Sequence, residues 1–285
     1  MQKILHIGVL SDHSISMRVH QRAAADDLKS YFKGLVEGFA NSDDLVFVHH
    51  LGHSIGLHEF GSDFVTIDHS RHSQNGMFFE NVHLFNLLEK SSDGYVVSGS
   101  STRLDDAIIT IIKKFELIEQ QYTNDKDTQV DFLVMCTSDG ENNDSAYSHY
   151  TSTHENAMRR VEAKSKAGNW TFTFRAPLSH LDLVRSSYSA FPPDNILGWD
   201  TSSAKGLDVA STVTNSSMSG YIQSRSTGLR SVNTFFTANA LTEQDRKAIE
   251  KMTDVSKLVT VWQIYDTDNG KQISEFCNER LKAFN

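Results

Sequence analysis

Short apolar runs alternate with stretches of helical periodicity along most of this chain. The run from Val130 to Cys136, for example, is followed at once by the polar turn Thr137-Ser138-Asp139-Gly140. Runs of this length that are bounded by turn-forming residues are typical of buried parallel strands. Between the runs, apolar residues recur three and four positions apart, as they do from residue 24 to residue 39. This spacing places them on one face of a helix.

The alternation predicts a fold class. Strands are expected at residues 4–10, 45–48, 130–136, 170–174 and 196–199, with an edge strand at 64–67. Helices are expected at residues 24–39, 104–118, 154–166 and 218–225, and residues 78–88 also have apolar positions at helical spacing. Strands that alternate with helices require crossover connections, which give a mostly parallel sheet with helices on both faces. We therefore expect a Rossmann-like, doubly wound α/β fold.

Residues 1–240 are expected to form this domain, with a polar, histidine-rich insertion at residues 51–100. The pattern changes after residue 240. A helix is expected to begin near Thr242, followed by a strand at 258–264 and a last helix at 273–284. We expect residues 241–285 to form a small C-terminal α/β extension.

Composition excludes several classes of protein. The net charge of −9 argues against a dedicated nucleic-acid-binding protein, which needs a basic face. No apolar run reaches the roughly 18 residues of a transmembrane helix, and residues 1–10 lack the pattern of a secretory signal. Two cysteines far apart form no disulfide framework, so a reducing, cytoplasmic location is expected.

Three polar segments are expected to meet at one edge of the predicted sheet. Asp12, Ser14 and Ser16 follow the first strand, Asp139 follows the strand that ends at Cys136, and Thr102 precedes a helix. Ligands bind at the carboxyl ends of the strands in open parallel sheets. Carboxylate and hydroxyl oxygens suit a hard cation such as Mg²⁺.

These segments resemble the metal-ion-dependent adhesion site of von Willebrand factor type A domains. The resemblance covers roughly residues 1–235. Residues 99–107 and 139–142 look particularly like bacterial and phage-encoded members. It implies that Ser14, Ser16 and Thr102 bind Mg²⁺ directly, while Asp12 and Asp139 act mostly through water. Mn²⁺ or Ca²⁺ are possible substitutes. The resemblance also implies that a partner protein supplies an Asp or Glu carboxylate to the ion, and that no catalysis takes place.

The histidines offer a competing interpretation. Seven of the 13 lie between His49 and His83, which raises the question of a zinc site. None of them forms a His-Glu-x-x-His motif, so exposed imidazoles in a polar insertion are the favoured interpretation. His13 is expected to point away from the ion, with contact to a partner at the rim left open. Such histidines would make partner binding sensitive to pH near about 6.5.

Two other functions stay open at this point. One is a hydrolase, either a Mg²⁺ phosphatase that uses Asp12 or a zinc enzyme. The phosphatase is disfavoured because Ser14 stands where a second carboxylate would serve as general acid or base. The other is a structural or assembly protein that uses the fold as a scaffold. Asp105, Asp106 and Glu141 are expected to be solvated rather than to support the metal ligands.

Overall fold

A computed structural model describes residues 2–39, 44–53, 57–59, 65–67, 102–138, 150–201, 206–226, 228–236 and 282. Its strands are β1 (Gln2–Asp12), β2 (Leu45–His53), β3 (Leu57–Glu59), β4 (Val65–Ile67), β5 (Thr128–Thr137), β6 (Trp170–Pro177) and β7 (Ile196–Trp199). Its helices are α1 (Gln21–Phe39), α3 (Leu104–Gln121), α4 (Tyr150–Ser165), α5 (Leu181–Ser187) and α6 (Gly206–Ser226), with short 3-10 helices η1 (Ile15–His20), η3 (Leu178–His180) and η4 (Pro193–Asn195).

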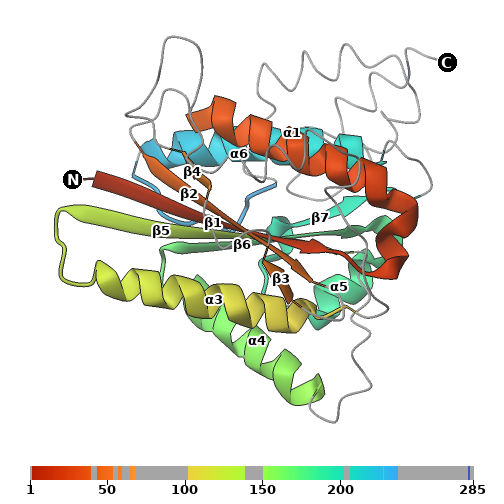
Figure 1. The fold of residues 1–285 in the computed structure, drawn as a ribbon, viewed down its shortest axis with the longest axis horizontal. Helices are drawn as coiled ribbons and strands as arrows, with labels where there is room; N and C mark the ends of the chain where they lie inside the picture. The colour runs from red at the N-terminus through yellow and green to blue at the C-terminus, as the bar shows by residue number, and fades with distance from the viewer. Residues whose placement is uncertain are drawn as a thin grey trace.

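The strands form one sheet in the order β3-β2-β1-β5-β6-β7, and β4 also pairs with β2. Strands β2, β1, β5, β6 and β7 are parallel, whereas β3 and β4 are antiparallel to β2. Helices α1 and α6 cover one face, and α3, α4 and α5 cover the other (Figure 1). The predicted doubly wound α/β fold class is therefore confirmed, including an edge strand within the predicted range 64–67.

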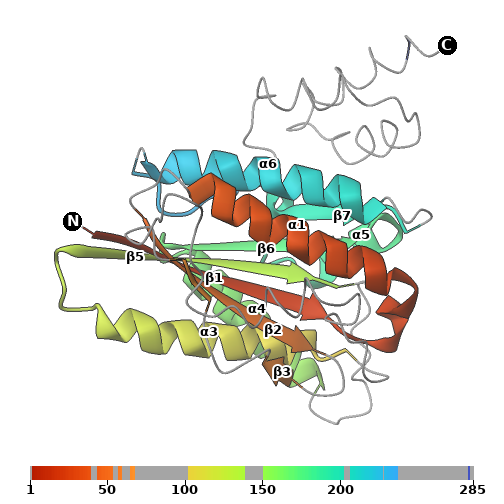
Figure 2. The ribbon, with the colours of Figure 1, turned by 45° about the horizontal axis from the view of Figure 1, so that its top comes forward.

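Strand β1 shows why both faces need a cover. Leu5, Ile7 and Val9 alternate with Ile4 and Leu10, and each set belongs to a different hydrophobic cluster. Successive side chains of a strand point to opposite faces, so an apolar strand of this kind is buried on both sides. The first cluster lies under α1 and α6, which run side by side in Figures 1 and 2.

The second cluster lies under α3 and α4 and is rich in aromatic rings. Phe132 stacks on Trp170 with ring centroids 4.4 Å apart, and Phe115 of α3 lies 5.1 Å from Phe132. Helix α3 also approaches β1 closely at Gly8, where an added Cβ would lie 2.7 Å from Ile111 Cγ1. Glycine at this position allows the helix to sit directly on the strand.

Several elements differ from their predicted bounds. Helix α6 starts at Gly206 rather than at residue 218, and helix α5 was not predicted. Strand β2 extends to His53, so the first residues of the predicted insertion belong to the sheet. The predicted helix at 78–88 lies outside the described residues. So does the C-terminal extension at 241–285, apart from Lys282. Within the described part of the chain, no helix is long and apolar enough to cross a bilayer.

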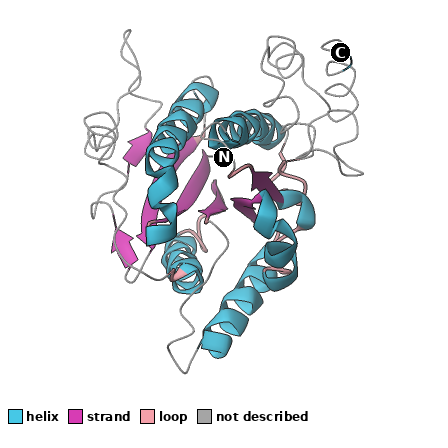
Figure 3. Cartoon of the chain, turned by 90° about the vertical axis from the view of Figure 1, so that its right-hand side faces the viewer, coloured by secondary structure: helices cyan, strands magenta, loops and turns pink. Residues whose placement is uncertain are grey.

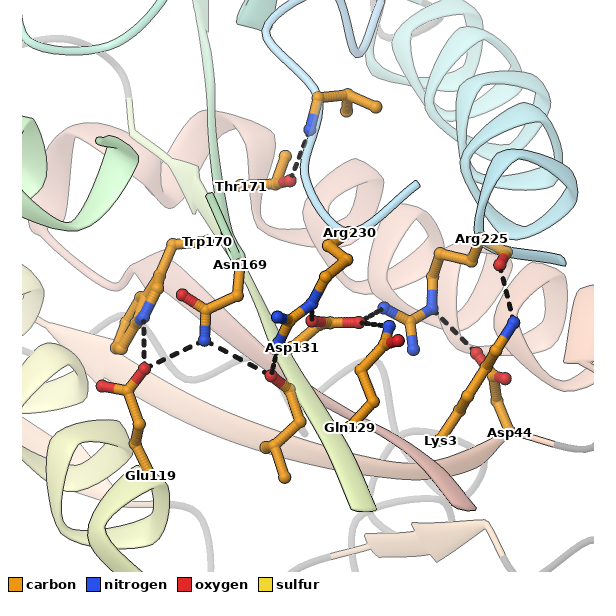
Figure 4. Close-up of polar contacts among 12 residues, drawn as sticks. Lys3, Asp44, Glu119, Gln129, Asp131, Asn169, Trp170, Thr171, Arg225 and Arg230 are labelled. Atoms are coloured by element: carbon orange, nitrogen blue, oxygen red, sulfur yellow. Dashed lines mark hydrogen bonds and ion pairs between the residues drawn. The ribbon is translucent and has the colours of Figure 1, made fainter. Parts of the chain in front are cut away.

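A buried group of charged side chains closes the amino-terminal edge of the sheet (Figure 4). Arg225, at the end of α6, donates to Asp131 of β5 at 2.5 Å and to Asp44 at 2.8 Å. Asp131 also accepts from Arg230 at 2.8 Å and from Gln129 at 2.7 Å. Because Asp131 and Arg225 are at most 1% exposed, each charge depends on its partners rather than on water.

We predict that Asp131→Ala destabilises the protein by about 3 kcal/mol or more, since it leaves Arg225 with a single buried counter-charge. Urea unfolding would measure this change. The matched control is Glu162→Ala, which removes an exposed ion pair with Lys166. That control is expected to change stability little, because the pair is exposed to solvent. Equal losses in the two variants would show that the buried group contributes no more than a surface pair.

Candidate functional site at the carboxyl edge of the sheet

The register of the parallel strands brings three chain segments to the same edge. Asp12 of β1 pairs with His53 of β2, and Ser11 pairs with Thr137 of β5. Figure 3 looks onto this edge and shows helices on both sides of the strands. The loop after β1 and the residue after β5, Ser138, therefore begin at the same level.

Asp12 is fully buried, and both of its carboxylate oxygens accept hydrogen bonds. The backbone N–H of Ser14 donates to Oδ1 at 2.8 Å, and the hydroxyl of Ser138 donates to Oδ2 at 2.7 Å. The first bond is an Asx-type turn, which shapes the loop that leaves β1. The second bond joins this loop to the end of β5. Asp12 therefore holds two of the edge segments together.

Ser14 and Ser16 are the next predicted ligands along the chain. Their hydroxyl oxygens lie 2.7 Å apart and form a hydrogen bond, so the two side chains lie together. Ser14 is buried, whereas Ser16 is exposed. The pair therefore lies at the boundary between the interior and the solvent, where an ion could still be reached by a partner.

Thr102 precedes α3 and is 1% exposed. Its hydroxyl has no hydrogen-bond partner among the described residues. The start of α3 lies at the carboxyl edge (Figure 1), where Asp105 acts electrostatically on His53 of β2 and on Cys136 of β5. A buried hydroxyl without a partner costs about 1–3 kcal/mol. A ligand that the described residues do not supply would satisfy it.

The oxygen atoms of the candidate ligands that the structure describes suit a hard divalent cation. Asp12, Ser14, Ser16 and Thr102 offer one carboxylate and three hydroxyls, which match the oxygen preference of Mg²⁺. Asp139 lies outside the described residues, as does Glu141. No cluster of three or more His, Cys, Asp or Glu side chains able to hold a metal occurs in the described ranges. A set made mainly of hydroxyls is not a cluster of that kind.

Two histidines of strand β2, one just before the predicted insertion and one within it, are not exposed. His49 and His53 are 5% and 0% exposed, and both lie in strand β2. Burial lowers the pKa of His53 to about 3 and the pKa of His49 well below its ordinary value. These rings are therefore neutral core side chains, and the expectation of exposed, titrating imidazoles is wrong for them. His58, His69, His72 and His83 lack described side chains.

His13 is also buried, at 1% exposure. Its Nε2 lies 3.1 Å from the hydroxyl of Ser11, which in turn lies 2.6 Å from Nε2 of His50. The expectation that His13 points away from the ligands agrees with this contact. Contact with a partner at the rim does not, because the ring faces the interior.

Asp105 and His154 form a contact that the sequence did not reveal. Asp105 is 3% exposed rather than solvated, and its Oδ2 lies 3.1 Å from Nδ1 of His154. The other ring nitrogen of His154 lies 2.9 Å from the carbonyl oxygen of Ser187. Because both nitrogens face acceptors, the protonated ring can donate twice, and the hydrogen bond to Asp105 raises the pKa of His154. The contact joins α3, α4 and α5 beside Thr102.

Asp106 behaves differently from Asp105. It is part-buried and forms an ion pair with Arg103 at 2.5 Å.

Ser138, whose hydroxyl bonds to Asp12, is the other residue of the site that was not predicted from the sequence. A hydroxyl residue directly after the strand that pairs with β1 was the available signal, because the carboxyl ends of adjacent parallel strands lie together.

Comparison with known proteins gives only structural likenesses. No family model and no curated protein matches the chain. A von Willebrand factor type A protein from Catenulispora acidiphila has a TM-score of 0.46 at 11% identity, covering 77% of this chain and 43% of its own. The pilus adhesin SpaC from Lactobacillus rhamnosus GG has a TM-score of 0.46 at 11% identity, covering 78% and 30%.

Manganese-loaded TRAP protein from Plasmodium vivax has a TM-score of 0.40 at 14% identity, covering 71% of each chain. The chain thus spans less than half the length of the first two proteins. With TM-scores below 0.5, these likenesses assign neither a function nor a residue role to this chain.

We predict that His154 makes stability depend on pH. A histidine whose folded pKa is raised stabilises the fold fully below its unfolded pKa of about 6.5. That stabilisation is lost as the pH rises through the folded pKa. His154→Gln should therefore lower the free energy of unfolding more at about pH 5.5 than at about pH 9. Urea titrations at both values would test this, and an equal loss at both would contradict it.

Proposed function

We propose that this chain is a protein-interaction module of the von Willebrand factor type A kind. Mg²⁺ at the carboxyl edge of its sheet would bind an acidic side chain of a partner protein. The observation that carries the proposal is the buried hydroxyl of Thr102, which lies at this edge without a hydrogen-bond partner among the described residues. A cation held there would give that oxygen a ligand role.

The chain's own residues prepare the site in separate ways. Ser14 and Ser16 present two hydroxyl oxygens 2.7 Å apart. Asp12 is oriented by its bonds to Ser14 N–H and to Ser138, and its negative charge favours a cation nearby. We assign Asp139 to the same set from its place in the sequence. When bound, the ion supplies excess positive charge that attracts a carboxylate.

Binding rather than catalysis is the better use of these groups. Ser14 cannot act as a general acid or base at neutral pH. Asp12 is fully buried, with both carboxylate oxygens already accepting hydrogen bonds, so it is poorly placed to attack a substrate. The proposed partner therefore keeps its covalent structure and contributes only its carboxylate. Mn²⁺ is a useful substitute probe, since it also prefers oxygen ligands.

We predict that Thr102→Val weakens Mg²⁺ binding by about tenfold or more, because a metal ligand is lost. The substitution should not destabilise the apo protein, since the buried hydroxyl it removes has no partner among the described residues. Isothermal titration calorimetry measures the affinity, and urea unfolding measures the stability.

The matched control is Thr123→Val at the other end of α3, where the hydroxyl is exposed and donates to the carbonyl of Glu119. It should leave Mg²⁺ affinity unchanged. Ser16→Ala gives an independent check at an exposed ligand. If Thr102→Val and Ser16→Ala both bind Mg²⁺ as the wild type does, the proposed site is wrong.

A further inference from the structure

The short helix η1 presents two different sides. In a 3-10 helix, side chains three positions apart lie one above the other. One such line, formed by Ser14, Met17 and His20, faces inward. Met17 is fully buried, and the ring of His20 meets the ring of Trp199 edge-on, with centroids 5.0 Å apart.

The other two lines face solvent. Ile15 and Val19 are 49% and 84% exposed, and Val19 is the most exposed of the large hydrophobic side chains described. Arg18, on the line of Ile15, is exposed as well. Val19 shares its line with Ser16, the exposed hydroxyl of the proposed metal site, and the line continues to the exposed Arg22 at the start of α1.

Single exposed hydrophobic residues are ordinary, but the position of this one is specific. An exposed apolar side chain stands between a proposed cation ligand and an arginine, in a line that begins at the binding edge. We call Ser16, Val19 and Arg22 the η1 stripe. Ile15 and Arg18 widen it on one side.

Charge indicates which partner the stripe fits. The chain has a net charge of −9, yet residues 13–25 contain two arginines and no acidic residue, and the nearest exposed carboxylate along the chain is Asp26, one helical turn after Arg22. Neither Arg18 nor Arg22 forms an ion pair in the described part of the chain. Two exposed arginines without an ion pair among the described residues favour contact with an acidic side chain of a partner over contact with a basic one.

Spacing indicates the partner's sequence pattern. A 3-10 helix rises about 2.0 Å per residue, so Ser16 and Val19 are separated by about 6 Å along its axis. An extended peptide advances about 3.3 Å per residue, and its side chains at positions i, i+2 and i+4 share one face. Two positions of the peptide therefore match one step of the stripe.

We propose that the η1 stripe binds an extended partner segment of the pattern acidic-x-apolar-x-acidic. The first acidic side chain reaches the ion beside Ser16, the apolar side chain covers Val19 and Ile15, and the second acidic side chain pairs with Arg22 or Arg18. This proposal rests on the proposed function for its first contact only. The apolar and second acidic contacts depend on the chain alone.

The experiment uses the full chain and fluorescein-labelled peptides in Mg²⁺, with fluorescence polarisation as the readout. The probe is Ser-Asp-Ser-Leu-Ser-Glu-Ser. Its controls replace Leu by Ser, replace Glu by Gln, or insert one Ser between Asp and Leu to break the spacing. Val19→Ser and Arg22→Gln should each weaken binding of the probe by about five- to tenfold. Leu117→Ser, which changes an exposed apolar residue of α3, should have no effect.

The outcomes separate the two proposals. If EDTA or Thr102→Val removes binding but Val19→Ser and Arg22→Gln do not weaken it, the stripe is overturned and the metal site stands. If the η1 variants weaken binding and EDTA does not, the stripe stands without the metal. Failure of the wild type to prefer the probe over the control peptides at millimolar concentration overturns the stripe. Self-association that Val19→Ser abolishes would identify a second copy as the occupant and also overturn it.

Discussion

Strand β1 has a parallel neighbour on each side along its length, and this double pairing fixes the site. Asp12 lies level with His53 on one side, and Ser11 lies level with Thr137 on the other. A shift of one residue would turn every side chain of the strand to the opposite face. Such a shift is disfavoured because it would replace Gly8 by a larger side chain where α3 packs closely on the strand. The relative heights of the edge segments are therefore set by backbone hydrogen bonds rather than by the polar side chains themselves.

Much of this architecture could be predicted from the sequence, because buried parallel strands leave a clear record as short apolar runs. The helices that cover the sheet were harder to predict from the sequence. In the first half of α6, buried apolar residues are interrupted by the buried hydroxyl residues Ser211 and Thr214, so its apolar pattern is weak. These hydroxyls bond to Asp27 of α1 and to Arg175 of β6, which form a buried ion pair. A polar residue that is buried against residues far away in the sequence cannot be distinguished, from the sequence alone, from a polar residue exposed to solvent.

The same limit applies to the candidate site. Asp12, Ser14, Ser16 and Thr102 were predicted as ligands because their order and types match a known pattern. The structure describes all four residues, but their role as metal ligands stays a prediction. Asp139 stays a prediction. Ser138 and the contact between Asp105 and His154 were missed, since their roles depend on which strands and helices become neighbours. The buried histidines of β2 were misjudged because a neutral imidazole packs like an aromatic ring. The ring of His49, for example, meets the ring of Phe115 edge-on with centroids 4.9 Å apart.

Gly8 has a mechanical consequence for the whole edge. Ile111 of α3 occupies the space that a side chain on Gly8 would fill, so the helix rests in a notch of the sheet. Thr102 lies nine residues before Ile111, and most of that interval is helix at about 1.5 Å per residue. The close contact between Gly8 and Ile111 therefore limits movement of α3 along its axis, and it fixes the position of the start of the helix at the carboxyl edge of the sheet. Movement of α3 along its axis would require Ile111 to leave the space beside Gly8, whereas rotation or tilting of the helix about Ile111 would not.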